Sequence, residues 1–413
     1  MSGGRPGRLR ALRRFGRLVL AVRVLIWISC MGACACVAGW GSSGISGRMV
    51  AYGAQESELS LDPEVQAGWE DIDRFLREET DGIGPELSFS ALVKALMAQD
   101  ADAATKILLK AAEETLFGEI RRSGHLAGQL LALGVIGAIF SGFSEIFSEN
   151  QISETGFFMT YLLAFTVLAA SFYDSTRIAA QVLERQAMFM KVLLPSYFLA
   201  VAWAGSSVTS AAWYEFVLFL IAAVQWLYLN LLTPLVRVYI LLVLAGNMAK
   251  EEMLSHMTSL LKTAVCYGTR SLLGVVMGFQ LIQGMVLPYA DAVRSVGVQK
   301  LLQVIPGIGQ GAGAVTKLIL GSGVLIKNTM GAAAVFFLLL ISLLPILKLA
   351  VILMLYRGIA AVLEPIADKR LVGCILGVAE GQKMLLGLAA SGLLLFVLTI
   401  ALICTGTNVS YLA

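Results

Sequence analysis

The stretch MLLGLAASGLLLFVLTIALIC, residues 384–404, contains no charged side chain, and neither do residues 405–413. A second stretch, GAAAVFFLLLISLLPILKLAVILMLY at 331–356, contains one, Lys348. A helix needs roughly 20 apolar residues to cross a bilayer. Lipid admits only helices or closed barrels as spanning structures, and continuous apolarity without a period of two is typical of helices. We therefore expect an all-α, polytopic helical integral membrane protein.

The composition agrees with this fold class. The 413 residues are 58% hydrophobic and 14% charged, whereas about 25% of a soluble domain is charged. The net charge of +3 is small, and the absence of a basic patch with interleaved aromatic residues argues against a nucleic-acid partner. The polar segment 41–122 holds no cysteine, so no disulfide framework is predicted. The six cysteines are Cys30, Cys34, Cys36, Cys266, Cys374 and Cys404.

The N-terminus has the pattern of a secretory signal. Arginines crowd residues 1–23, and the apolar run VLIWISCMGACACVAGW follows at 24–40. Small residues at Val37-Ala38-Gly39 or Ala51-Tyr52-Gly53 offer cleavage sites; an uncleaved anchor is the alternative. We assign 1–40 as a signal-type segment. Because the arginines stay in the cytoplasm, the segment that follows is expected outside.

Residues 41–122 form an acidic region with 16 Asp plus Glu and 8 Lys plus Arg. Asp62 before Pro63 is typical of a helix start, and Trp69, Ile72 and Phe75 then recur at helical spacing. Two more amphipathic helices are expected at about 87–99 and 102–120. We predict a small helical extracytoplasmic region, which would fold by itself, lie on the membrane or dock to a partner.

Residues 123–413 are expected to form a membrane domain with six to eight spans. A tight hairpin or one kinked span would both fit Thr233-Pro234 between two of them. Three intermediate stretches, 250–270, 291–330 and 357–383, suit interfacial or re-entrant helices. The expected spans cover about 126–147, 155–173, 187–205, 213–232, 234–248, 271–290, 331–356 and 384–406.

The most unusual local sequence is VIPGIGQGAGAVTKLILGSG at 304–323. It lacks the GxxxxGK[ST] string of a phosphate loop and the βαβ context of a dinucleotide site. Two interpretations remain open. The small residues would let helices pack closely, or a broken glycine-rich segment would line a water-filled cavity. The candidate packing or pore-lining residues are Gly307, Gly309, Gly311 and Gly313.

Ionisable residues inside membrane spans are functional candidates by default. Lys348 lies deepest in its expected span, three residues after Pro345. His125 and His256 are isolated, and no motif supplies a nucleophile with a base, so we expect no enzyme, no cofactor and no metal site. The full set of such residues is Glu145, Lys191, Glu215, Arg237 and Lys348.

The C-terminal third resembles stage III sporulation protein AE of endospore-forming bacteria. The resemblance rests on Leu325-Ile326-Lys327-Asn328 with Gly331, Pro345 and Lys348 inside a span, Tyr356, Leu363-Glu364-Pro365 and Gly406-Thr407-Asn408-Val409. It extends more loosely over 126–413, and the signal and polar segment fit in order and size.

This resemblance implies a non-enzymatic subunit of the mother cell–forespore channel or secretion complex required for endospore formation, either a permease-like core or an assembly platform. The implied partners are the other membrane proteins of the stage III sporulation channel, its cytoplasmic ATPase and a forespore ring protein. The implied location is the mother-cell-derived membrane around the forespore. A stand-alone secondary transporter for a small solute is the alternative, and would show internal repeats with paired broken helices.

Overall fold

The computed structural model describes residues 70–72, 74, 118, 124–139, 151–203, 207–248, 253–303, 309–363 and the continuous stretch on to 406. The signal-type segment, most of the acidic region and Glu145 lie outside these residues. Side chains are described over 158–202, 214–247, 255–282 and 322–404, in the helix Gly124–Ile139, and at 70–72, 74 and 118. The helices are α5 (Gln151–Trp203), α6 (Ser207–Trp226), α7 (Thr233–Met248), α8 (Met253–Gln303), α9 (Gly309–Leu363) and α10 (Lys369–Gly406).

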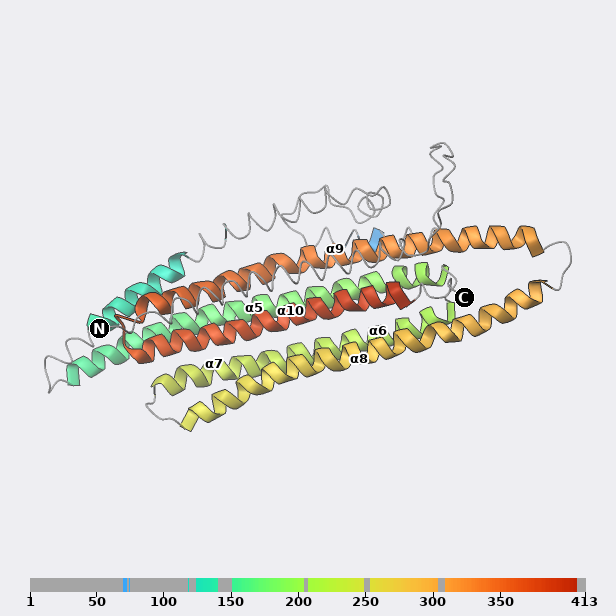
Figure 1. Cartoon of the computed structure of the whole chain (residues 1–413). Helices are drawn as coiled ribbons and strands as arrows, with labels where there is room; N and C mark the ends of the chain where they lie inside the picture. The colour runs from blue at the N-terminus through green and yellow to red at the C-terminus, as the bar shows by residue number, and fades with distance from the viewer. Residues whose placement is uncertain are drawn as a thin grey trace, which may run out of the picture.

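These helices lie side by side along one long axis, and the chain reverses direction at the ends of the bundle (Figure 1). Helix α10 occupies the centre, because it packs against α5, α7, α8 and α9. The core is mainly apolar, and Leu168, Leu338, Leu349, Leu385 and Leu388 are fully buried in it. No strand occurs among the residues the structure describes, so the all-α fold class is confirmed.

Five helical stretches in the described part are long and apolar enough to cross a membrane. A shorter apolar helix, Gly124–Ile139, packs through Gly134 against Leu363 of α9. The chain is therefore a helical protein of the multi-pass membrane type, while the number of its crossings stays a prediction. The five stretches are Phe158–Ala202, Tyr214–Asn247, Ser255–Ile282, Ser322–Leu363 and Lys369–Cys404.

The spans expected at 155–173 and 187–205 are parts of one helix, α5. The intervening residues continue the helix because they are amphipathic: Ala179, Val182 and Leu183 are buried against the bundle, whereas Arg177 and Glu184 are exposed. A charge on the outer face does not interrupt a helix whose inner face is packed.

The spans expected at 213–232 and 234–248 also form one continuous path. A π-helical segment, Leu227–Leu232, joins α6 to α7 immediately before Pro234. The Thr233 N–H bonds the carbonyl of Tyr228, and the Thr233 hydroxyl donates to the same carbonyl at 2.7 Å. Because Pro234 has no N–H to donate, the wider π turn accommodates it without a hairpin.

Where the structure describes them, the three stretches expected as interfacial or re-entrant helices are parts of the long helices, and their position relative to the membrane stays a prediction. Residues 253–270 begin α8, and 291–303 and 309–330 extend α8 and α9. Residues 357–363 end α9, a turn follows in which Ala367 N–H bonds the Leu363 carbonyl at 2.7 Å, and 369–383 begin α10. The amphipathic sequence of these stretches belongs to the parts of the long helices that extend beyond their apolar middles.

The apolar middles are free of charge and lie at one level. We call residues 216–236, 328–347 and 384–404 the charge-free belt; each stretch is about 30 Å long as a helix, which matches a bilayer core. Gln186 of α5 bonds both Ser342 and the Ala389 carbonyl, and Tyr228 bonds Ser391, so the three stretches are level with one another. Arg237, Lys348 and Lys383 flank one edge, the Arg237 edge; Glu215 and Lys327 flank the other.

Candidate functional site: a glutamate cluster and the polar contacts of the bundle

The largest group of charges in the described part surrounds Glu380 of α10. Its carboxylate lies 3.1 Å from Lys262 of α8, 3.3 Å from Arg357 of α9 and 3.5 Å from Lys383. Three helices therefore meet at one carboxylate just beyond the Arg237 edge of the belt. Such a network holds helices together, because each cation gains a partner at a half-buried position. We call these four residues the Glu380 cluster.

Buried glutamines provide polar contacts between helices within the belt and just beyond its Arg237 edge. Gln186 Nε2 donates to Ser342 Oγ at 3.1 Å, Gln280 Nε2 donates to Thr399 Oγ1 at 2.6 Å, and Gln382 Nε2 donates to the Leu349 carbonyl at 3.2 Å. The Oε1 atoms of all three glutamines lack a partner among the described residues. Each amide therefore joins two helices through its donor, which fixes their register at little cost in apolar packing.

Tyrosine hydroxyls connect α5 and α7 to their neighbours. Tyr161 donates to the Leu244 carbonyl at 2.7 Å and contacts Cys374 Sγ at 2.8 Å. Tyr197 contacts Cys404 Sγ at 2.8 Å, and Tyr356 donates to Ser171 at 2.7 Å. These cysteines are buried packing residues, as expected for small apolar side chains.

A glycine stripe on α10, which the sequence reasoning missed, lets α7 approach closely. Gly373, Gly377 and Gly381 are four residues apart, and a Cβ at each would meet Asn247, Val243 and Ile240 of α7 respectively. The spacing itself, small residues every four positions, was the available signal.

The candidate glycines lie at the start of α9. Gly309, Gly311 and Gly313 belong to its first turns, so that part of the chain is helical, and Gly307 lies outside the described residues. A broken conformation at 309–313 is therefore absent from the structure. Whether these glycines pack against a partner or line a pore stays a prediction.

The two lysines that flank the belt in α9 differ in burial from what the sequence predicts. Lys348, expected to be deepest, is half-buried and makes no hydrogen bond or ion pair with the described residues. Lys327 is fully buried, although the sequence offered it only as part of the Leu-Ile-Lys-Asn string. Residue burial here depends on which helix face meets α5 and α10, and sequence position alone does not reveal that.

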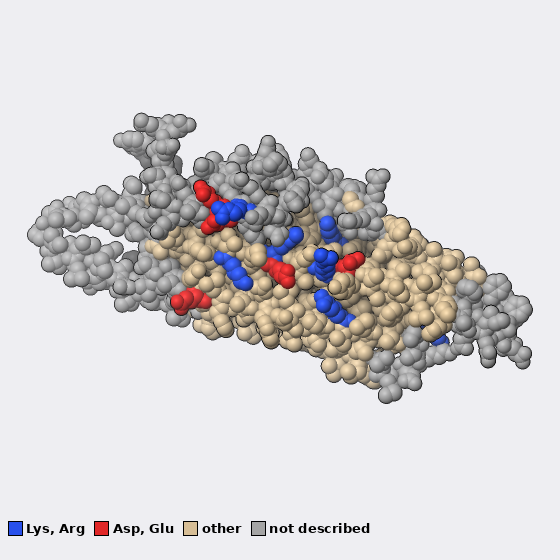
Figure 2. Space-filling model, turned by 180° about the vertical axis from the view of Figure 1, so that it is seen from behind, with Lys and Arg blue, Asp and Glu red and all other residues tan. Residues whose placement is uncertain are grey.

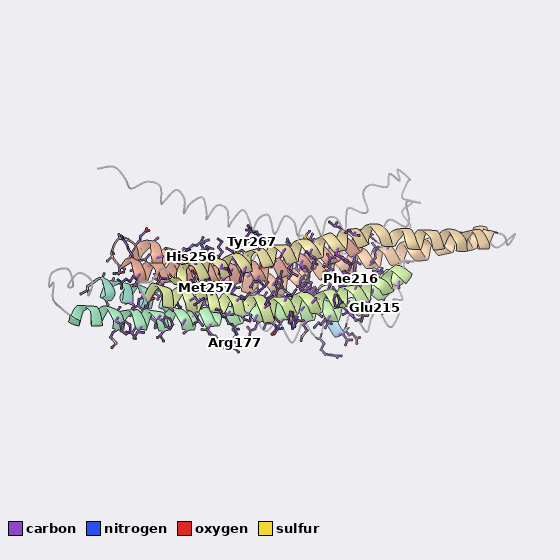
Figure 3. The ribbon with its side chains drawn as sticks, turned by 90° about the horizontal axis from the view of Figure 1, so that it is seen from below. Arg177, Glu215, Phe216, His256, Met257 and Tyr267 are labelled. Atoms are coloured by element: carbon purple, nitrogen blue, oxygen red, sulfur yellow. The ribbon has the colours of Figure 1, made fainter. Side chains whose placement is uncertain are left out.

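The other ionisable candidates lie on the surface of the bundle. Lys191 Nζ donates to Gln225 Oε1 at 3.0 Å, and Arg237 lies 5.9 Å from the ring centre of Tyr173. Glu215 on α6 and His256 on α8 lie toward opposite ends of the bundle (Figure 3). In the part of the chain that the structure describes, no three His, Cys, Asp or Glu side chains converge in a way that would hold a metal ion.

Comparisons with known proteins agree with this layout. The sequence model of the family described as stage III sporulation protein AE matches residues 87–407. The curated stage III sporulation protein AE of Bacillus subtilis (strain 168) is 22% identical over 360 residues, which cover 86% of this chain and 89% of that relative. No solved structure matches the chain.

Proposed function

Because the chain belongs to the stage III sporulation protein AE family, we propose that it is a non-enzymatic membrane subunit of the channel or secretion complex between mother cell and forespore. Its sporulation role follows from the family; the complex, its mother-cell-derived membrane and the absence of enzymatic activity are the proposal. The partners proposed are the other membrane proteins of that channel, its cytoplasmic ATPase and a forespore ring protein. The acidic region 41–122 would face the intermembrane space.

The packing of α10 against its four neighbours is the observation that carries this proposal. Side chains fill the centre of the described bundle: Leu385, Leu388 and Leu395 of α10 are fully buried against α5 and α9. At Gly331 of α9, a Cβ would overlap Cys404 of α10 and lie 3.2 Å from the Tyr197 hydroxyl of α5. Backbones this close leave room for side chains only, as in the interior of any well-packed protein.

A chain whose centre is filled with side chains is better suited to a role in an assembly than to transporting a solute by itself. A stand-alone secondary transporter binds its substrate at mid-membrane between two repeats, on discontinuous helices. Helices α9 and α10 pass through the belt without interruption. We therefore favour an assembly platform whose outer surfaces meet other subunits over a permease that works by itself.

Purification under native conditions tests the proposal. The chain, tagged at its C-terminus, would be extracted in mild detergent from sporulating cells and from vegetative cells that express it. We expect a stoichiometric complex with other sporulation membrane proteins only from the sporulating cells. A single well-behaved chain from both sources would reject the assembly and favour the transporter.

A further inference from the structure

Helix α5 carries exposed charges deeper into the level of the belt than any other described helix. In α5, five polar residues, Asp174, Arg177, Gln181, Glu184 and Lys191, follow one another at spacings of three, four or seven residues, and all five are exposed, as is Met188 between the last two. Residues so spaced share one helix face. We call the five polar residues the α5 stripe. Figure 2 shows acidic and basic side chains crossing the middle of one face of the molecule.

The other helices present mostly apolar side chains at the same level, with Asn230 and Arg270 among the exposed exceptions. Between Glu215 and Arg237, the exposed large side chains of α6 and α7 include Phe219 and Trp226. Helix α9 exposes no side chain between residues 328 and 347, and within 384–404 α10 exposes Gly387 alone. The described part of helix α8 exposes one charge at the level of the belt, Arg270. Lys262 pairs with Glu380 and Gln280 bonds Thr399, so Arg270 lies about 7 Å inside the Arg237 edge. Within the described helices, only α5 carries an exposed charge to the middle of the belt, at Lys191.

Contacts fix how deep the α5 stripe reaches. Ser171 bonds Tyr356 and Gln186 bonds Ser342, so α5 and α9 run antiparallel in a constant register. Lys348, at the Arg237 edge, is level with residues 179–180 of α5. Asp174 and Arg177 therefore lie outside the belt, Gln181 lies at its edge, and Glu184 lies about 6 Å inside.

Lys191 lies at the middle of the belt. It bonds Gln225, which follows Glu215 by ten residues and precedes Arg237 by twelve. Either edge is then about 15 Å or more away along the helix axis, which is farther than a lysine side chain extends. The next position on the same face is Pro195, which is apolar, so the polar face ends at mid-belt.

We propose that the α5 stripe lines a water-filled vestibule, which enters the membrane from the Arg237 edge, ends at Lys191 and Gln225, and is closed on its outer side by neighbouring subunits. Ionisable residues at membrane depth face water or a polar partner, because hydrocarbon solvates them poorly. Water solvates both signs of charge and the Gln181 amide along the whole stripe. The mixed charges suit hydrated polar solutes without strong selection for anions or cations.

A second copy packed directly against the stripe fits these residues less well. A copy in the same membrane orientation would offer Glu184 about 10 Å and Glu215 about 15 Å from the level of Lys191. No described carboxylate of the chain lies at that level. Direct helix contact would therefore leave the amine in apolar surroundings, whereas a hydrated vestibule does not.

The inference rests on the proposed function, since other subunits must close the vestibule, and cysteine labelling tests it. The parent protein would lack Cys266 and the three N-terminal cysteines but keep the buried Cys374 and Cys404. Gln181→Cys, Glu184→Cys and Lys191→Cys would be reacted with a membrane-impermeant maleimide in permeabilised sporulating cells, so that both membrane faces are reached. Trp226→Cys is the matched control, because it is 60% exposed and adjoins Gln225 at the depth of Lys191.

Thiolate forms only where water reaches the thiol, so we expect the stripe cysteines to react at least about tenfold faster than Trp226→Cys. Labelling of the stripe no faster than of the control would overturn the vestibule. Native purification of the same samples separates the two proposals. An intact assembly with an unlabelled stripe rejects the vestibule alone, whereas an isolated chain with an unlabelled stripe rejects the assembly and the vestibule together.

Discussion

Replacing Gly377 with alanine is expected to push α10 away from α7. The new methyl group would overlap Val243 Cγ1, and the Val243 Cβ lies only 3.4 Å away. Valine is β-branched and holds one strongly preferred rotamer in a helix, so its side chain cannot swing aside. The backbones must separate instead, and the neighbouring contacts Gly373–Asn247 and Gly381–Ile240 loosen with them.

The magnitude follows from the cost of overpacking, which is about 1–3 kcal/mol for an added methyl group in a packed interior. Because the obstacle is a methyl group of a side chain with one strongly preferred rotamer, we expect a value near the upper end, about 2–3 kcal/mol. Gly377→Ala combined with Val243→Ala should recover most of this loss, since the second change removes the group that clashes. Gly387→Ala is the matched control on the same helix: its Cβ would meet no atom within 4 Å, and alanine there should be neutral or stabilising by about 0.5–1 kcal/mol.

The assay is unfolding of the purified protein in mixed micelles of increasing denaturing-detergent content, monitored by tryptophan fluorescence. Equal stability of Gly377→Ala and Gly387→Ala would refute the reasoning. So would a double variant less stable than Gly377→Ala, because the destabilisation would then not arise from contact between residues 377 and 243.

Two further predictions concern the charged end and the N-terminus. Glu380→Gln should destabilise the bundle by about 1 kcal/mol, because Lys262, Arg357 and Lys383 lose their shared carboxylate, and high salt should reduce this effect. The control Glu364→Gln, in the exposed turn after α9, should change little in the same unfolding assay. The mass of the purified chain should lack about 40 to 53 N-terminal residues if a signal peptidase cleaves at either small-residue site; recovery of only the full-length chain would leave an uncleaved anchor.

The fold class was predictable from the sequence because a long charge-free run without alternation crosses a membrane as a helix. The run 384–404 lies within α10, and the run 331–356 lies within α9. Helix ends were less predictable. Charged residues on an outer face, such as Arg177 and Glu184, read as a loop in sequence although the buried face of α5 continues through them.

The contacts that matter for function needed the structure. Burial of Lys327 rather than Lys348 depends on how α9 is rotated against its neighbours, and the Glu380 cluster joins residues about 120 positions apart. The resemblance at 325–365 led to the correct family, which the match over 87–407 confirms. Composition and periodicity alone would have stopped at a multi-pass membrane protein.

Compartment-specific complementation tests the central claim most directly, that this chain works in a mother-cell membrane assembly that supports the forespore. In a strain lacking the gene, the chain would be restored by a promoter active only in the mother cell or only in the forespore, and late forespore gene expression would be followed with a fluorescent reporter. The account predicts that expression in the mother cell alone restores the reporter and spore formation. Rescue by the forespore copy alone, or a normal reporter without any copy, would contradict it.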